Sequence, residues 1–187
     1  MRIIFIRHGM TAGNTEKRYI GRTDEPLCEE GKKALKERSS LKPDIVITSP
    51  MKRCVQTAKL LFDGVEPVTE EDLREVDFGA FEGRNYSELI GDHAYQSWLD
   101  SGGKMRFPGG EDPAEFKKRC TAAFLGLVKR YSELERIAFV VHGGTIMAIL
   151  EEFVQDGKSF YDYHVENGCG YLTEYKDGHL EIISILQ

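Results

Sequence analysis

The chain has 187 residues, which suits one domain with a substantial core. Its net charge of −6 and lack of an extended basic tract exclude a typical nucleic-acid or anionic-membrane binder, so we expect neither partner. The four cysteines are widely spaced without a C-x-x-C pair, which argues against a metal site, and we expect no cofactor. The N-terminus does not resemble a signal peptide, so we expect reduced thiols and a cytoplasmic location.

Three short apolar runs predict the buried strands of a sheet. They cover residues 2–7, Asp44–Thr48 and Ile137–Val141, and helical patterns lie between them. Continuous hydrophobic character of this kind is typical of parallel strands that are buried on both faces.

The helical patterns carry recognisable start signals. Ser49 is predicted to cap a helix that has Pro50 at its first position. A capping box over Asp112–Glu115 predicts the start of a long amphipathic helix, and a third apolar stripe follows Thr145. Strands that alternate with helices favour an α/β fold, with a mainly parallel sheet covered on both faces.

The C-terminal part departs from this alternation. Asp177-Gly178 separates Gly170–Tyr175 from Leu180–Leu186 and predicts a tight hairpin, so we expect one antiparallel strand in the sheet. Further back, the glycine-rich stretch Gly91–Gly110 predicts a weak helix followed by an irregular loop. That stretch is our candidate for a lid or specificity element.

Two histidines follow predicted strands at equivalent positions. His8 directly follows residues 2–7 and precedes Gly9, while His142 directly follows Ile137–Val141 and precedes Gly143. Ligands of open parallel sheets bind outside the carboxyl ends of the strands, so neighbouring strands would bring both imidazoles to one crevice. A single histidine here would more simply be structural, but two, each followed by a glycine that lets backbone amides approach an anion, favour a site. We expect the other histidines at the surface, namely His93, His164 and His179.

Two arginines are predicted to reach the same crevice. Arg7 directly precedes His8, and Arg53 lies in the first turn of the helix after Ser49, with Thr57 one turn behind it. Long helical side chains lean back toward the helix N-terminus, which here abuts a strand end. Because a planar guanidinium matches two phosphate oxygens, the combination predicts a phosphoryl-binding pocket.

Five ordered blocks of the sequence resemble the histidine phosphatase superfamily, the phosphoglycerate mutase-like group. They are Arg7-His8-Gly9-Met10-Thr11 with Asn14 and Gly21–Leu27, Ser49–Arg53 with Gln56-Thr57-Ala58, Leu73–Glu75 with Phe78–Gly83, Pro108–Glu111, and Val141–Gly144. An isolated Arg-His-Gly would be weak, but five blocks in order form a specific pattern.

The resemblance implies roles for the matching positions. His8 would be the nucleophile and Glu75 the proton donor, with Arg7, Arg53 and His142 completing the catalytic set. The phosphoryl group would be bound by Arg7, Asn14, Gly21, Arg53, His142 and Gly143. Spacing alone leaves Asp77 and Glu82 equally open as the acid. We also expect a backbone carbonyl to hold the second ring nitrogen of His8.

The resemblance also implies the fold and activity. Residues 1–187 would form a single histidine phosphatase domain, a three-layer α/β/α sandwich of the phosphoglycerate mutase-like kind, as a monomer or homodimer. We expect it to hydrolyse a small phosphomonoester through a phosphohistidine. The segment from Trp98 to Glu111 resembles alpha-ribazole phosphatases, so alpha-ribazole 5′-phosphate is one candidate substrate.

Two alternative functions stay open. A phosphoglycerate mutase usually has a longer insertion than Asn85–Arg136 offers. A catalytically silent phospho-ligand binding module would normally lack one member of the catalytic set, and here the set is intact.

Overall fold

The computed structural model describes residues 1–36 and 41–187 and contains a six-stranded sheet in the order β3-β2-β4-β1-β5-β6. Strand β1 is parallel to β4, β4 to β2, and β2 to β3, whereas β5 runs antiparallel to both β1 and β6. The mostly parallel sheet with one antiparallel strand is therefore confirmed. The strands are β1 (Arg2–Arg7), β2 (Ile45–Thr48), β3 (Val68–Thr69), β4 (Arg136–Val141), β5 (Gly170–Lys176) and β6 (His179–Leu186).

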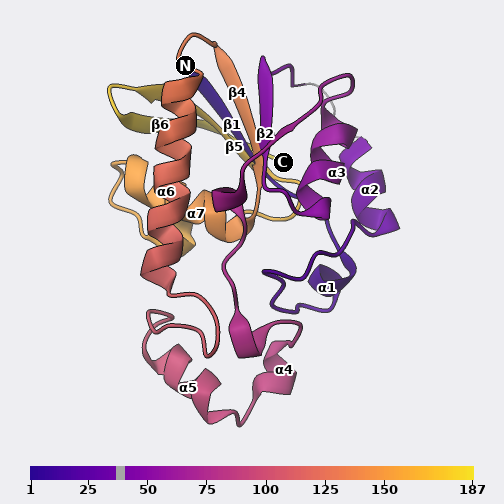
Figure 1. The fold of residues 1–187 in the computed structure, drawn as a ribbon, viewed down its shortest axis with the longest axis vertical. Coiled ribbons are helices and arrows are strands. Elements are labelled where there is room, and N and C mark those ends of the chain that lie inside the picture. Colours follow the sequence, from indigo (N-terminus) through magenta and orange to yellow (C-terminus); the bar gives the residue numbers. More distant parts are fainter. Residues whose placement is uncertain (37–40) are drawn as a thin grey trace.

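Helices cover both faces of the sheet, as the three-layer prediction requires (Figure 1). On one face lie α6 (Pro113–Arg130) and α7 (Gly143–Phe153), and on the other α2 (Glu29–Lys36) and α3 (Lys52–Leu61). Successive strand residues point to opposite faces, so Phe5 of β1 packs against Phe124 of α6 while Ile4 joins the cluster that includes Ala58 of α3. In the described part of the chain, no helix has the length and hydropathy needed to cross a membrane.

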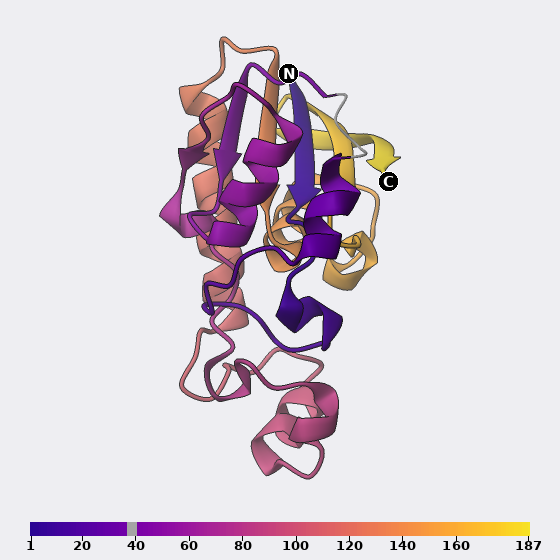
Figure 2. The ribbon, with the colours of Figure 1, turned by 90° about the vertical axis from the view of Figure 1, so that its right-hand side faces the viewer.

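A lobe extends beyond the carboxyl ends of the parallel strands (Figure 2). It contains α4 (Tyr86–Leu89) and α5 (His93–Asp100), while the short helix α1 (Ala12–Thr15) lies between it and the sheet. Within Gly91–Gly110 a short helix is followed by irregular backbone, as predicted. The core of the lobe is rich in aromatic side chains, namely Tyr19, Phe78, Phe81, Tyr95, Trp98 and Phe107.

Two of the predicted helix starts need correction. Helix α3 begins at Lys52 with Met51 as its N-cap residue, so Ser49 does not cap it; the Ser49 hydroxyl lies instead 2.8 Å from Nε2 of His142. Asp112 does cap α6, by accepting from the amide of Ala114. Glu115 forms an ion pair with Arg106 at 2.7 Å, and the structure assigns α6 no reciprocal capping box.

The C-terminal hairpin forms where the sequence predicts it. Asp177 and Gly178 have φ angles of 51° and 85°, so both central residues of the turn lie in the left-handed region. Two-residue turns of this type match the twist of the flanking strands. The hairpin places β5 beside β1 and β6 at the sheet edge.

Candidate active site

His8 and His142 meet at the carboxyl ends of β1 and β4. These strands are hydrogen-bonded neighbours, and the amide of His8 donates to the carbonyl of Val141 at 2.9 Å. The two imidazole centroids are 5.3 Å apart with an interplanar angle of 68°, and both rings are buried. The prediction that two histidines distant in sequence share one crevice is therefore confirmed as geometry.

The ring of His8 is held by the backbone that follows it. Its Nδ1 lies 2.8 Å from the carbonyl oxygen of Gly9, which selects the tautomer with a proton on Nδ1 and a lone pair on Nε2. The amide of Gly9 donates to Oγ1 of Thr57, whose hydroxyl donates to the carbonyl of Arg53, so this loop is fixed to α3. Burial and the nearby guanidiniums of Arg53 and Arg7 hold the pKa of His8 well below its usual value. The imidazole is consequently neutral at pH 7.

His142 is oriented by a hydroxyl that the sequence analysis had assigned to a helix cap. Ser49 Oγ lies 2.8 Å from Nε2 of His142. A hydroxyl that donates in this bond corresponds to the tautomer with the ring proton on Nδ1. The thiol of Cys54 lies 3.6 and 3.8 Å from the two ring nitrogens, a near-equal spacing that indicates packing on the ring and not a directed hydrogen bond. Burial, Arg53 and His8 together lower the pKa of His142 well below its usual value.

Arg53 is fully buried and held by main-chain carbonyls. Its Nη1 donates to Thr23 O at 2.7 Å and its Nη2 to Gly21 O at 2.8 Å. Its Nε has no hydrogen-bond partner among the described residues. A buried guanidinium with an unpaired N–H lowers the stability of the fold unless an anion accepts a hydrogen bond from that N–H.

Arg7 presents a similar arrangement from the end of β1. Its Nη1 donates to the carbonyl of Val165 at 2.8 Å and lies 3.4 Å from Nε2 of His164. Its Nε also lacks a partner within the described part of the chain. His164 is exposed, as predicted, but it lies at the site and not on a remote surface.

Gly21 lies next to Arg53 and Glu82. Its amide and that of Thr23 each donate to Oε1 of Glu82 at 2.8 Å, and its carbonyl accepts from Arg53. In this structure the amide of Gly21 is therefore paired with Glu82, and its carbonyl helps to hold Arg53; its part in binding a phosphoryl group stays a prediction. A side chain at this position would run into the carbonyl of Val76, which explains the glycine.

Asn14 lies beside the loop that follows His8. Its Oδ1 accepts from the amide of Thr11 at 3.2 Å and from Nδ2 of Asn167 at 3.1 Å, which leaves its own amide group as a donor. Asn167 also donates to the carbonyl of His8 at 3.1 Å. Asn167 could not be predicted from the sequence, because no motif marks the segment before β5.

Glu75 reaches the crevice from the 71–78 segment. Its Oε2 accepts from the amide of Gly144 at the start of α7, and its Oε1 from the amide of Val76, both at 3.0 Å. A side chain on Gly144 would overlap the carboxyl group, so the second glycine after His142 makes room for Glu75. Burial raises the pKa of Glu75 even though these two amides and the arginines oppose the change. A carboxylic acid poised to give up a proton has this character.

The other two acidic candidates are engaged elsewhere. Asp77 pairs with Arg22 at 3.1 Å, and Glu82 accepts from the amides of Gly21 and Thr23. Of the three carboxylates that spacing left open, Glu75 is therefore the one placed at the histidine crevice.

Arg119 of α6 fixes the backbone that carries Glu75. Its Nη1 donates to the carbonyls of Asp72 and Arg74, both at 2.8 Å, and its Nη2 to the carbonyl of Glu75 at 3.2 Å. Glu111 receives two further bonds from the same guanidinium, at 2.6 and 2.9 Å. The Pro108–Glu111 motif thus acts on the site indirectly, by holding the arginine that positions the acid.

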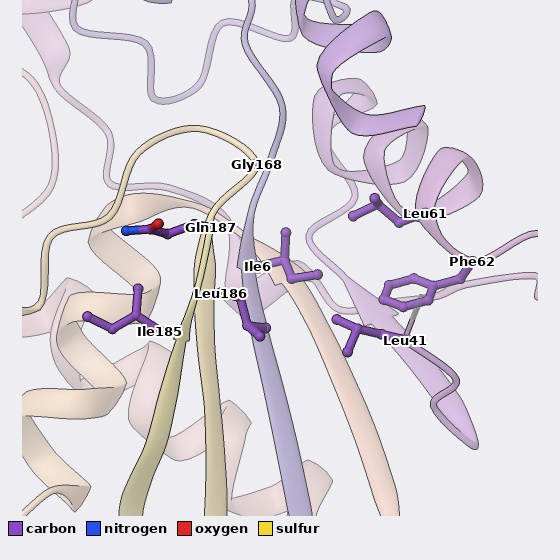
Figure 3. A pocket seen from close by; sticks show the side chains of 8 residues that line it. All are labelled: Ile6, Leu41, Leu61, Phe62, Gly168, Ile185, Leu186 and Gln187. Atoms are coloured by element: carbon purple, nitrogen blue, oxygen red, sulfur yellow. The ribbon is translucent and has the colours of Figure 1, made fainter. Parts of the chain in front are cut away.

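A large pocket opens beside this cluster. It has a volume of about 790 Å³, and Arg7, Glu75, Gly143 and Gly144 line one end of it. A smaller hollow of about 200 Å³ has a mainly aliphatic lining that includes Leu61 and Leu186 (Figure 3). Within residues 1–36 and 41–187, no three His, Cys, Asp or Glu side chains are grouped to hold a metal ion.

Known proteins resemble this chain in sequence or in structure. Phosphoserine phosphatase 1 of Hydrogenobacter thermophilus is 29% identical over 150 residues, which cover 76% of this chain and 71% of that protein. A phosphoglycerate mutase from Thermus thermophilus superposes with a TM-score of 0.79 at 28% identity, covering 100% of this chain and 99% of that chain. The alpha-ribazole phosphatase of Shigella flexneri gives a TM-score of 0.88 at 22% identity, covering 100% and 96%, which shows a shared fold.

The family model for the histidine phosphatase superfamily, branch 1, matches residues 3–186. This match covers nearly the whole chain and includes every element that forms the crevice. The chain therefore belongs to the histidine phosphatase superfamily.

Proposed function

We propose that this protein is a phosphomonoester hydrolase that forms a phosphohistidine on His8, with residues 1–187 acting as one histidine phosphatase domain. The proposal rests on one observation. The neutral imidazole of His8 has its centroid 5.3 Å from that of a second imidazole, and it lies among two guanidiniums whose buried Nε–H groups have no partner in the part of the chain that the structure describes. Such a cluster stabilises a tetrahedral anion and is expensive to maintain without one.

In the first step, the Nε2 lone pair of His8 attacks phosphorus in line with the ester oxygen. The N–P bond forms as the P–O ester bond breaks. Arg7, Arg53 and Nδ1–H of His142 stabilise the charge on the equatorial oxygens, with Asn14 and the amide of Gly143 as further donors. The protonated carboxyl of Glu75 gives its proton to the departing alkoxide.

In the second step, water replaces the alcohol. The Glu75 carboxylate accepts a proton from this water as its oxygen attacks phosphorus, and the N–P bond breaks to return neutral His8 and inorganic phosphate. The residues named here supply the nucleophile, the charge stabilisation and the acid. The mechanism therefore assigns no step to a cofactor.

Hydrolysis is favoured over phosphoglycerate mutase activity by the middle of the chain. A mutase has to keep its phosphohistidine away from water, and the segment Asn85–Arg136 is occupied by α4, α5 and the long α6. The substrate we carry forward from the sequence is a small phosphorylated metabolite, with alpha-ribazole 5′-phosphate as a specific candidate. The shared fold with an alpha-ribazole phosphatase supports testing it.

A panel of esters tests the proposal. Purified protein and a His8→Ala variant are incubated with p-nitrophenyl phosphate, alpha-ribazole 5′-phosphate and 3-phosphoglycerate. We expect phosphate release by the wild type and a loss of about 10⁴-fold or more in the variant at unchanged melting temperature. An isomerised product without phosphate release would favour the mutase, and silence on every ester would favour a phospho-ligand binding module. Activity retained by a folded His8→Ala variant would remove His8 as the nucleophile.

A further inference from the structure

The large pocket extends along one face of α7, away from the histidines. Gly143, Met147 and Glu151 line it at intervals of four residues, so they lie one above another on the helix surface. Glu151 is eight positions after Gly143, which corresponds to a rise of about 12 Å along the helix axis. The phosphoryl end is marked by Arg7 and Glu75, and the pocket therefore offers a leaving group about 12 Å of reach beyond the anion site.

Aromatic rings form the walls of this pocket. Four of them come from the lobe and its entry, and two from the 3-10 turn after α7: Tyr19, Phe78, Trp98, Phe107, Phe160 and Tyr161. Several of these rings are fixed by contacts with one another; Phe78 and Phe107, for example, meet edge to face with centroids 5.2 Å apart. Fixed rings around an open volume favour a flat, apolar occupant, since stacking adds to the gain from burial.

The charges at the far end of the pocket compensate each other. Lys117 Nζ lies 2.5 Å from Oε2 of Glu151, whose Oε1 accepts from the amide of Phe160. The same ammonium lies 4.4 Å above the Phe160 ring. The remaining lysine of the lining, Lys104, is exposed at the rim. An occupant with a second negative charge would find no free buried cation beyond the phosphoryl site among these lining residues.

We infer that the alcohol part of the substrate is a flat, largely apolar and uncharged aromatic group that lies along α7 between the two sets of rings. This inference rests on the proposed phosphatase activity and specifies its substrate class. We therefore expect small esters that carry extra charges, such as phosphoserine and 3-phosphoglycerate, to be poor substrates. Relatives of this chain are nevertheless named for phosphoserine and phosphoglycerate.

A pair of esters with the same kind of leaving oxygen tests the inference. Ethyl phosphate and 2-(2-naphthyl)ethyl phosphate both release a primary alcohol, so they differ in the group that fills the pocket and little in intrinsic reactivity. We expect kcat/KM to be about 10²-fold higher for the naphthyl ester, the size expected for burying an aromatic group of this area. Phosphoserine should fall at or below ethyl phosphate.

A pocket-filling variant locates the effect. Met147→Trp places a large side chain in the middle of the pocket, and we expect the ratio of the two kcat/KM values to fall below about 10. Leu125→Trp is the matched control, because Leu125 is exposed on α6 and does not line the pocket. It should leave the ratio unchanged. If Met147→Trp does not fold, Phe160→Ala serves instead. It removes a half-buried ring from the pocket wall and should also lower the ratio of the two kcat/KM values.

Binding of phosphonates separates this inference from the proposed function. Calorimetry with 2-(2-naphthyl)ethylphosphonate and ethylphosphonate needs no turnover, and the naphthyl compound should bind about 10²-fold more tightly. Equal affinities, a ratio that Met147→Trp leaves unchanged, or phosphoserine as the best substrate would each overturn the inference while leaving His8-dependent hydrolysis intact. Tighter naphthyl binding without hydrolysis of any ester would support the pocket and reject the phosphatase.

Discussion

The crevice at the strand ends and the aromatic lobe beside it are built in different ways. In the crevice, polar groups are buried and held by the main chain: the carbonyl of Gly9 orients His8, and those of Gly21 and Thr23 hold Arg53. In the lobe, rings such as Phe81 and Trp98 pack against one another. Directed hydrogen bonds fix reacting atoms, whereas apolar packing shapes a volume. We therefore expect the chemistry and the substrate preference of this protein to depend on separate regions.

Of the substitutions in these two regions, we expect the largest effect on activity from replacing Glu75, the acid of the crevice. Glu75→Gln should slow hydrolysis of alkyl phosphates by about 10²- to 10⁴-fold, because the leaving alkoxide loses its proton donor. Phosphorylation by p-nitrophenyl phosphate should change much less, since that leaving group hardly needs a proton. Single-turnover kinetics on both esters measures this difference. Equal losses on the two esters would remove Glu75 from the acid role.

Removing a ring from the lobe should cost stability without disturbing the crevice. Phe81 is fully buried and meets the ring of Tyr95 edge to face at 5.2 Å, so Phe81→Ala should lower the free energy of unfolding by about 3–5 kcal/mol. Inhibition by inorganic phosphate should stay within about twofold, because phosphate occupies the crevice alone. Denaturant unfolding and phosphate inhibition constants check both parts. A parallel collapse of phosphate affinity would show that the two regions are not separable.

The buried histidines predict a pH dependence of stability that belongs to the crevice. The pKa values of His8 and His142 lie well below the usual 6.5, so the folded protein binds fewer protons than the unfolded chain below that pH. The stability that these two neutral histidines contribute is fully present above about pH 6.5. It is lost as the pH falls toward their folded-state pKa values, by about 1.4 kcal/mol of unfolding free energy per pH unit for each group. Glu75, whose pKa is raised, acts in the opposite direction.

The variant His142→Asn isolates the contribution of His142 to the pH dependence of the unfolding free energy. Between about pH 5 and 6.5, the slope of unfolding free energy against pH should fall relative to wild type, by at most about 1.4 kcal/mol per unit, because one titrating group is gone. The contribution of Glu75 is common to both proteins. Chemical denaturation across this range provides the slopes, and identical slopes would show that His142 titrates normally in the folded state.

The smallest expected effect concerns the hydroxyl that orients His142. Ser49→Ala removes the hydrogen bond to Nε2, and kcat should fall about 10-fold with little change in KM, as one buried hydrogen bond is lost. Ser49→Thr keeps the hydroxyl and should restore part of the rate. Ser184→Ala, on the exposed face of β6, is the control. A drop in thermal stability with unchanged kcat would limit Ser49 to a structural role.

The sheet and most of the crevice follow from the sequence because local signals agree with the fold. Apolar runs mark β1, β2 and β4, and a tight-turn dipeptide at Asp177 marks the hairpin. His8 and His142 both follow strands, and parallel pairing then brings them together. The placement of Arg7 and Arg53 at this crevice also follows from their positions in the sequence. The role of Glu75 came from the family resemblance, because spacing alone did not separate it from Asp77 and Glu82.

The remaining features depend on contacts between segments distant in sequence. Ser49 looked like a helix cap because a Ser-Pro pair usually marks that position, but it lies 2.8 Å from a histidine 93 residues away. The amide of Gly21 is used by Glu82, and only the folded chain shows it. The aromatic pocket likewise combines α7 with rings from several separate parts of the sequence, and no periodic pattern predicts such a volume.

In the proposed mechanism, His8 carries the phosphoryl group between the two half-reactions. Protein mixed with p-nitrophenyl phosphate and quenched in alkali within milliseconds can be digested and analysed by mass spectrometry. We expect one phosphoryl group on the peptide that contains His8. It should be absent from His8→Ala and should be removed by water in the wild type. Phosphate release without any phosphorylated peptide, or a phosphoryl group on another residue, would contradict it.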